Sequence, residues 1–363
     1  MTHTLDLLSR ALREPQSTAS LQLEDWDLLV RQARHADLLA RLCVLLEEGN
    51  LLGDVPPEAR RHLESARVKA GAHERVVRWE AYQIRRALEH LDVPVILLKG
   101  AAYVLAELPT GQGRLFYDVD ILVPKEDLDL VEQALLRQGW MSTHLDAYDQ
   151  RYYRQWMHEL PPMRHIQRHT VLDVHHTILP ETARVTPDPH KLVGAAKRLD
   201  GQGCFRILAP TDMVLHCVTH LFQDGEFEHG LRDLADFDSL LRHFGRDTTF
   251  WPKLVERARE LRLVRPLYYG LRYAHSILAT PIPQMVQEGL GLTNGVMAAL
   301  MDAVFTRGLA PDHPSCATSF TGLARWFLYV RGHSLRMPLH LLIPHLIRKA
   351  VRRGPRVKRG MQR

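Results

Sequence analysis

The sequence has few cysteines and no long apolar run without a charge. Its four cysteines are widely spaced along 363 residues and form no Cys-x-x-Cys pair, which argues against a disulfide framework or a zinc knuckle and favours reduced thiols. No stretch reaches transmembrane length without a charged residue. The N-terminal segment MTHTLDLLSRALREP lacks the uninterrupted apolar run of a secretory signal. We therefore expect a cytoplasmic protein.

Acidic residues are missing from the C-terminal part of the chain. No Asp or Glu follows Asp312, whereas eleven Lys or Arg lie between Arg325 and Arg363. The whole chain carries a net charge of +5, so the part before this stretch is mildly acidic. The basic tail, residues 348–363, suits an anionic membrane surface, where the protein would be peripheral, or the phosphate backbone of a nucleic acid. A solvated, disordered end is the alternative.

Hydrophobic spacing divides the chain into helical parts and one mixed part. Apolar residues recur at helical intervals before residue 92 and after residue 181, and Pro56-Pro57 opens a long helix. Trp79 and Tyr82 on that helix favour a core or interface role. We expect an α+β protein in which a small mixed β-sheet core is flanked by N- and C-terminal helical regions. The predicted units are 1–92, 93–180, 181–310 and, after a linker at Pro311 and Pro314, the basic segment 311–363.

Two carboxylates stand two residues apart in an otherwise apolar strand pattern. Alternate residues of a strand share a face, so Asp118 and Asp120 point to one side and Val119 and Ile121 to the other. Two neighbouring carboxylates at the edge of a core repel each other, and a divalent cation is their usual partner. The pair therefore indicates a metal site, although such pairs also occur on solvated strands.

The neighbouring segments supply further polar groups. A short buried strand ends at Lys99-Gly100, where a glycine turn at a helix start lets backbone N–H groups approach a phosphate. Downstream, the alternating segment TVLDVHHTI places Asp173 and His175 on one strand face. A third carboxylate and a histidine are thus available to the same site.

These residues resemble the uncharacterised nucleotidyltransferase family of bacteria, within the polymerase-β-like nucleotidyltransferase superfamily. The resemblance rests on LLKG, a following arginine, the Asp-x-Asp strand and the LDVHH strand, and it covers about residues 94–179. One departure concerns the usual Gly-Ser after the first strand, which is Gly100-Ala101 here. The serine hydroxyl is missing, so Lys99, Arg114 and backbone amides would contact the phosphates instead.

The resemblance implies an Mg²⁺-dependent transfer of a nucleotidyl group from an NTP, ATP first, to a hydroxyl acceptor, with release of pyrophosphate. Two Mg²⁺ ions, or Mn²⁺, would be held by Asp118, Asp120 and Asp173, which are the catalytic residues. His175 would orient Asp173, and a helical domain would close over the nucleotide. The nucleotide-binding candidates are Lys99, Gly100, Arg114, His175, His220 and Arg232.

Several of these residues have a second interpretation. Arg114 follows a glycine-rich loop and can reach a triphosphate or pair with Asp118. His216 and His220 lie one helical turn apart, but no third ligand is near in the sequence, which favours packing or a place beside the site over zinc. Arg232 and Asp233 can form an ordinary surface ion pair.

Three functions remain open from the sequence. The chain is a nucleotidyltransferase, or a nucleotide-binding module that has lost turnover, or an interaction protein that its basic tail recruits to a membrane or to nucleic acid. The missing serine permits the second function. The acceptor, the nucleotide and the oligomeric state are not encoded in any readable motif.

Overall fold

The computed structural model describes residues 5–143, 146–290, 295–338 and 340–343. The predicted basic tail, 348–363, lies outside them. All four cysteines fall inside and are free thiols, as predicted. Within the described part of the chain, no helix is both long enough and apolar enough to cross a membrane.

The fold is α+β, which confirms the predicted class. A seven-stranded mixed sheet has the strand order β3-β4-β5-β2-β1-β7-β6. The pairs β2–β5 and β1–β7 are parallel, and the other pairs are antiparallel. The strands are β1 (Val95–Leu97), β2 (Asp118–Leu122), β3 (Trp140–Ser142), β4 (Met163–His165), β5 (Val171–His175), β6 (Lys197–Arg198) and β7 (Phe205–Ile207).

The sheet continues beyond the predicted mixed unit. Strand β7 pairs in parallel with β1, and β6 pairs with β7, so part of the sheet comes from residues assigned to the C-terminal helical region. Strands of two or three residues are too short for an alternating pattern to show in the sequence. The boundary predicted at residue 180 therefore cuts through one continuous sheet.

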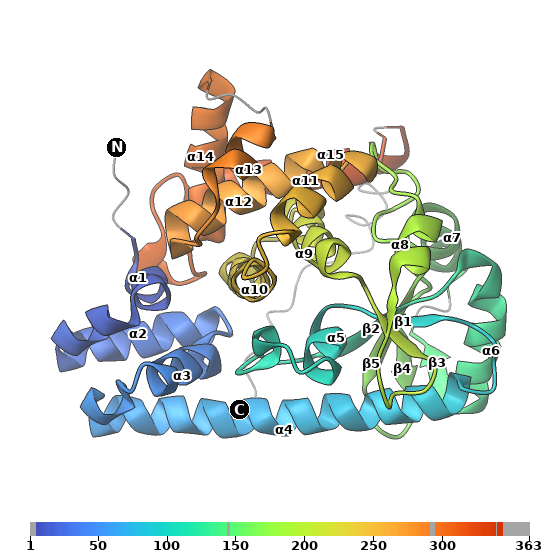
Figure 1. Ribbon diagram of the computed structural model, residues 1–363, viewed down its shortest axis with the longest axis horizontal. Coiled ribbons are helices and arrows are strands. Elements are labelled where there is room, and N and C mark those ends of the chain that lie inside the picture. The colour runs from blue at the N-terminus through green and yellow to red at the C-terminus, as the bar shows by residue number, and fades with distance from the viewer. Residues whose placement is uncertain (1–4, 144–145, 291–294, 339, 344–363) are drawn as a thin grey trace.

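One long helix runs along both the N-terminal helices and the sheet. Helix α4 (Pro57–Leu88) begins at the predicted proline pair and runs under α3, α5 and the sheet (Figure 1). Of the core or interface role predicted for Trp79 and Tyr82, the core role is wrong, because they are 55% and 41% exposed and stack on each other. The other helices here are α1 (Leu7–Arg13), α2 (Leu23–His35) and α3 (Leu39–Glu48).

Short helices connect the strands. Helix α5 (Lys99–Leu105) follows β1, α6 (Leu128–Arg137) follows β2, and α7 (Ala147–Trp156) lies between β3 and β4. Helix α8 (Pro189–Ala195) precedes β6.

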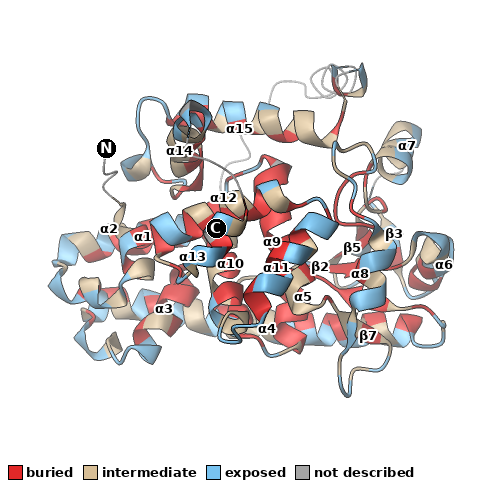
Figure 2. Cartoon of the chain, turned by 45° about the horizontal axis from the view of Figure 1, so that its top comes forward, coloured by how far each residue is buried: buried red, intermediate tan, exposed pale blue. Residues whose placement is uncertain are grey.

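Helices α9 and α10 form the centre of the C-terminal region and are largely buried (Figure 2). Helix α9 (Pro210–Asp224) starts at a proline and has no side-chain cap at its N-terminus. Asp212 pairs with Arg257 at 2.7 Å. The surrounding helices are α10 (Gly230–Phe244), α11 (Phe250–Glu260), α12 (Val264–Leu278), α13 (Gln284–Gly289), α14 (Val296–Leu309) and α15 (Thr321–Arg336).

The predicted linker is attached to the N-terminal helices. Ser315, between α14 and α15, accepts a hydrogen bond from Gln32 of α2 at 2.9 Å. The His313 ring lies edge-on to His35 with 5.4 Å between centroids. These contacts hold α15 against the body of the protein, where it packs on α14 and α9.

Candidate active site

The register between β2 and β5 brings the predicted acidic residues together. The two strands are parallel neighbours, with Asp120 opposite Asp173 and Leu122 opposite His175. Residues paired across parallel strands project to the same face of a sheet, and Asp118 shares that face two residues before Asp120. Three carboxylates and one imidazole thus lie on one face, which is the juxtaposition that the sequence predicted.

The opposite face of the same strands is core. Val119, Ile121, Leu172 and Val174 are all buried there. On the polar face, Asp118 at the strand start is exposed, whereas Asp120 is only 5% exposed. The acidic group therefore runs from the surface into the interior along one strand.

Two donors stabilise the charge of the Asp120 carboxylate. Its Oδ1 accepts from Lys99 Nζ at 3.3 Å and from His175 Nε2 at 3.0 Å, and neither contact uses Oδ2. Burial alone would raise the pKa of the Asp120 carboxyl, but the Lys99 ammonium and the His175 hydrogen bond hold that pKa below its ordinary value. Asp120 is therefore ionised at neutral pH.

One oxygen of the Asp173 carboxylate has no such donor. Its Oδ1 is buried and has no hydrogen-bond partner among the residues that the structure describes. Burial, and then the negative charges of Asp120 and Glu159, raise the pKa of Asp173 to about 7. A buried carboxylate oxygen without a donor, beside another carboxylate, fits an oxygen-binding divalent cation such as Mg²⁺.

His175 acts on a different carboxylate from the one predicted. The expectation was that it orients Asp173, but its hydrogen bond goes to Asp120. Because ionised Asp120 can only accept, Nε2 of His175 must carry the proton. Its other ring nitrogen, Nδ1, faces Glu159 Oε2 at 3.4 Å.

The Lys99-Gly100 turn is shaped by packing. Lys99 has a left-handed backbone with φ of 42°, an unfavourable conformation for a side chain of its size. A Cβ on Gly100 would lie 2.6 Å from the Phe116 ring and 2.7 Å from Arg114 Nη1. The glycine therefore makes room for these two side chains, whatever its place in phosphate binding.

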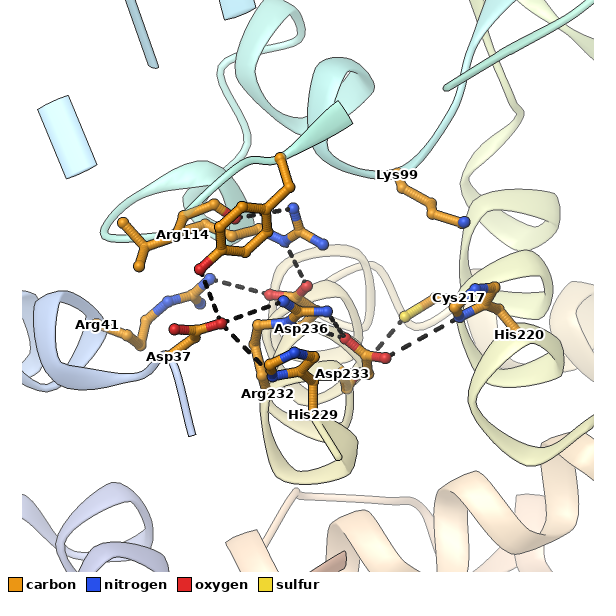
Figure 3. A network of polar contacts seen from close by, with 12 residues as sticks. Asp37, Arg41, Lys99, Arg114, Cys217, His220, His229, Arg232, Asp233 and Asp236 are labelled. Carbon is orange, nitrogen blue, oxygen red and sulfur yellow. Dashed lines mark hydrogen bonds and ion pairs between the residues drawn. The ribbon is translucent and has the colours of Figure 1, made fainter. Parts of the chain in front are cut away.

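Helix α10 and a neighbouring aromatic ring hold the Arg114 guanidinium. Its Nε donates to Asp236 Oδ2 of α10 at 2.7 Å (Figure 3). Its guanidinium lies over the Phe116 ring at 5.3 Å. The predicted pairing with Asp118 is wrong. Arg41 of α3 donates to the other oxygen of Asp236 at 3.1 Å, so one buried carboxylate joins three parts of the chain.

Arg232 and His220 lie beside this network. Arg232 donates to Asp233 at 3.0 Å and lies 3.8 Å from Asp37, which also accepts from Tyr117. His220 Nδ1 lies 4.0 Å from Asp233, and Figure 3 shows it on the same side of the network as Lys99. The ion pair expected for Arg232 and Asp233 is confirmed, but Arg232 is largely buried and is not a surface residue.

Sequence reasoning missed several residues of this region. Asp37, Arg41, Asp236, His158 and Glu159 belong to segments in which no motif or spacing marks them. Asp236 follows Arg114 by 122 positions. Asp236 and Arg114 come together because α10 packs against the turn Pro109–Gly111 in the loop before β2. For Asp236 the nearest signal in the sequence was the density of charged residues in LRDLADFD.

Comparison with protein families places this chain among the nucleotidyltransferases, proteins that transfer nucleotidyl groups. The chain belongs to the family described as uncharacterised nucleotidyltransferase, whose model matches residues 22–279. The match includes the acidic strands and helices α9 and α10. A comparison with curated proteins found no match.

Proposed function

We propose that this protein is an Mg²⁺-dependent nucleotidyltransferase of the polymerase-β-like type. It moves an NMP from an NTP, ATP first, to a hydroxyl acceptor and releases pyrophosphate. The observation that carries the proposal is the parallel register that sets Asp120 opposite Asp173, with Asp118 on the same face.

Asp118, Asp120 and Asp173 are the residues that would hold the metal. Two Mg²⁺ ions, or Mn²⁺, when bound lower the pKa of the attacking hydroxyl and neutralise charge on the departing pyrophosphate. The unpartnered Oδ1 of Asp173 and the pair of acidic residues on β2 are the donor set that such ions require.

The chain's own residues supply positioning and charge. Lys99, which reaches Asp120, is a candidate cation for the β- and γ-phosphates, together with Arg114. Asp173 is the candidate acceptor of the proton from the attacking hydroxyl. Arg114 holds α10 through Asp236 and so positions the helix that carries Arg232. His220 and Arg232 are the candidates for contacts with the base or ribose.

The test uses ATP labelled at the α- or γ-phosphate and incubated with the protein and cell extract. Label transfer from the α-phosphate alone, with pyrophosphate release, is expected; transfer from the γ-phosphate alone would show a kinase and refute the proposal. Asp118→Asn and Asp120→Asn should each abolish transfer. Asp129→Asn, at an exposed position on α6, is the matched control and should transfer normally.

The alternative of a module without turnover gives a different result. It predicts Mg²⁺-dependent ATP binding in titration calorimetry, lost in Asp120→Asn, with no pyrophosphate release on any acceptor. This alternative is supported by Ala101, which stands where the resembled superfamily has a serine hydroxyl.

We also propose that the C-terminal part binds an anionic membrane surface. Helix α15 packs through Ala324 and Leu328, while its other side exposes large apolar residues. The exposed residues are Phe320, Leu323, Trp326, Phe327 and Val330. An exposed apolar helix face followed in sequence by a basic tail is typical of interfacial membrane binding.

A further inference from the structure

The segment after α7 brings a second group of metal-binding side chains next to the acidic site. Its three members are His158, Glu159 and His175, and one ligand atom of each lies within 4.8 Å of those of the other two. Glu159 reaches this position through a β-bridge to His175, beyond the edge of the regular β5 pairing. Two imidazoles and one carboxylate thus converge from two segments.

The spacing of two of these groups matches that of ligands on one ion. His175 Nδ1 and Glu159 Oε2 are 3.4 Å apart. Two ligands at about 2.1 Å from a tetrahedral zinc ion lie about 3.4 Å from each other. The distance between these two atoms therefore suits ligands that share one small cation.

The hydrogen bond of His175 to Asp120 sets the ring in the orientation that a metal ligand needs. Nε2 donates to Asp120 Oδ1 at 3.0 Å, so the lone pair of a neutral ring lies on Nδ1, toward Glu159. Histidines that ligate metals generally donate their other N–H to a carboxylate or carbonyl, which fixes the tautomer. Asp120 fills that position here.

His158 provides an independent sign of a missing partner. Its Nδ1 is buried and makes no hydrogen bond to any residue in the described part of the chain. The ring stacks on His175 with 5.2 Å between centroids and 30° between planes. Buried polar atoms are normally satisfied, so an orphaned imidazole nitrogen beside a His–Glu pair calls for an explanation.

We propose that His158, Glu159 and His175 form a site for a borderline divalent cation, Zn²⁺ first, separate from the Mg²⁺ site of the three aspartates. Mixed imidazole and carboxylate ligands favour such ions, whereas Mg²⁺ favours oxygen ligands alone. Three protein ligands leave a position for water. Through His175 the ion fixes the orientation of Asp120, so the site is a support for the acidic cluster. The proposal of this zinc site does not rest on the proposed nucleotidyl transfer.

The test measures zinc binding by the full chain after removal of metal, using competition with a chromophoric chelator. One equivalent should bind to the wild-type protein. His158→Phe keeps the stacked ring but removes the ligand, and Glu159→Gln removes the charge. Each should weaken binding at least about 100-fold. His190→Phe, at an exposed position on α8, controls for surface histidines and should bind as the wild type does.

A thermal measurement separates a lost site from a damaged fold. Zinc should raise the Tm of the wild type and of Asp118→Asn but not that of His158→Phe, while the three proteins melt alike without zinc. Asp118→Asn should lose nucleotide transfer and keep zinc, so failure of the proposed reaction leaves this result unchanged. Equal zinc binding by wild type and His158→Phe would overturn the site. It would indicate a protonated His175 bridging two carboxylates without metal.

Discussion

Arg114 Nε donates to Asp236 Oδ2 at 2.7 Å, joining the loop before the acidic strand to helix α10. Arg41 uses the other oxygen of the same carboxylate and also donates to the Thr110 carbonyl. The Asp236 side chain is 4% exposed and that of Arg41 8%. One buried anion between two arginines therefore locks the N-terminal helices, the loop and the C-terminal helices together.

Asp236→Ala should destabilise the protein by about 3–5 kcal/mol, because it leaves two buried guanidinium groups without a counter-charge. Urea unfolding followed by circular dichroism measures the loss. Asp27→Ala is the matched control, since Asp27 pairs with Arg31 at an exposed position and should cost less than about 1 kcal/mol. Similar losses in the two variants would show that the Asp236 network contributes little.

Gly100→Ala should destabilise the protein by about 1–3 kcal/mol, because its new methyl group meets Phe116 and Arg114 at overlapping distances. Gly194→Ala in α8 is the contrasting change: among the described residues, no atom outside its own helix backbone and chain neighbours lies within 4 Å of the added atom. It should stabilise by about 0.5–1 kcal/mol through helix propensity. Thermal unfolding of both variants measures these changes as shifts in Tm. An unchanged Tm for Gly100→Ala would contradict the packing argument.

Asp173→Asn should stabilise the metal-free protein by about 1 kcal/mol, because it removes a partly buried negative charge opposite Asp120. The same change should abolish nucleotide transfer. Magnesium should then raise the Tm of the wild type and leave that of Asp173→Asn nearly constant. A lower Tm for the variant without metal would mean that Asp173 has a stabilising partner.

The protein should lose stability as the pH falls below about 6.5, in part through His216. Burial and the nearby charge of Lys99 lower the pKa of His216 well below its ordinary value. Below about pH 6.5 the unfolded chain therefore binds a proton on His216 that the folded chain does not. As the pH decreases, the free energy of unfolding decreases until the pH reaches the pKa of His216 in the folded protein. Urea unfolding at pH 7.5 and 5.5 measures the difference. It should shrink in His216→Gln but not in His190→Gln, an exposed control on α8.

Removal of residues 348–363 should reduce cosedimentation with vesicles that contain anionic phospholipid, at low salt. Trp326→Ser should reduce it further, because Trp326 is 61% exposed on the apolar side of α15. Neutral vesicles serve as the control. Binding to short duplex DNA in place of vesicles would show that the tail recognises phosphate backbones and that membrane binding is not its role.

The sequence by itself determined the local chemistry. Alternation in the strands fixed which face Asp118, Asp120, Asp173 and His175 share, since side-chain direction in a strand follows from position alone. Apolar spacing indicated α4 and the C-terminal helices in the same way, because helical periodicity is a local property.

Only the tertiary structure decided the partners. Three contacts join residues that are separated in the chain: Arg114 with Asp236, His175 with Asp120, and Glu159 with His175. Burial makes these contacts selective, because a charge removed from water must find whichever opposite charge the packing brings near. No spacing in the sequence encodes that proximity. Strands β6 and β7 were hidden for a related reason, since their two or three residues become strands only through pairing beside β1.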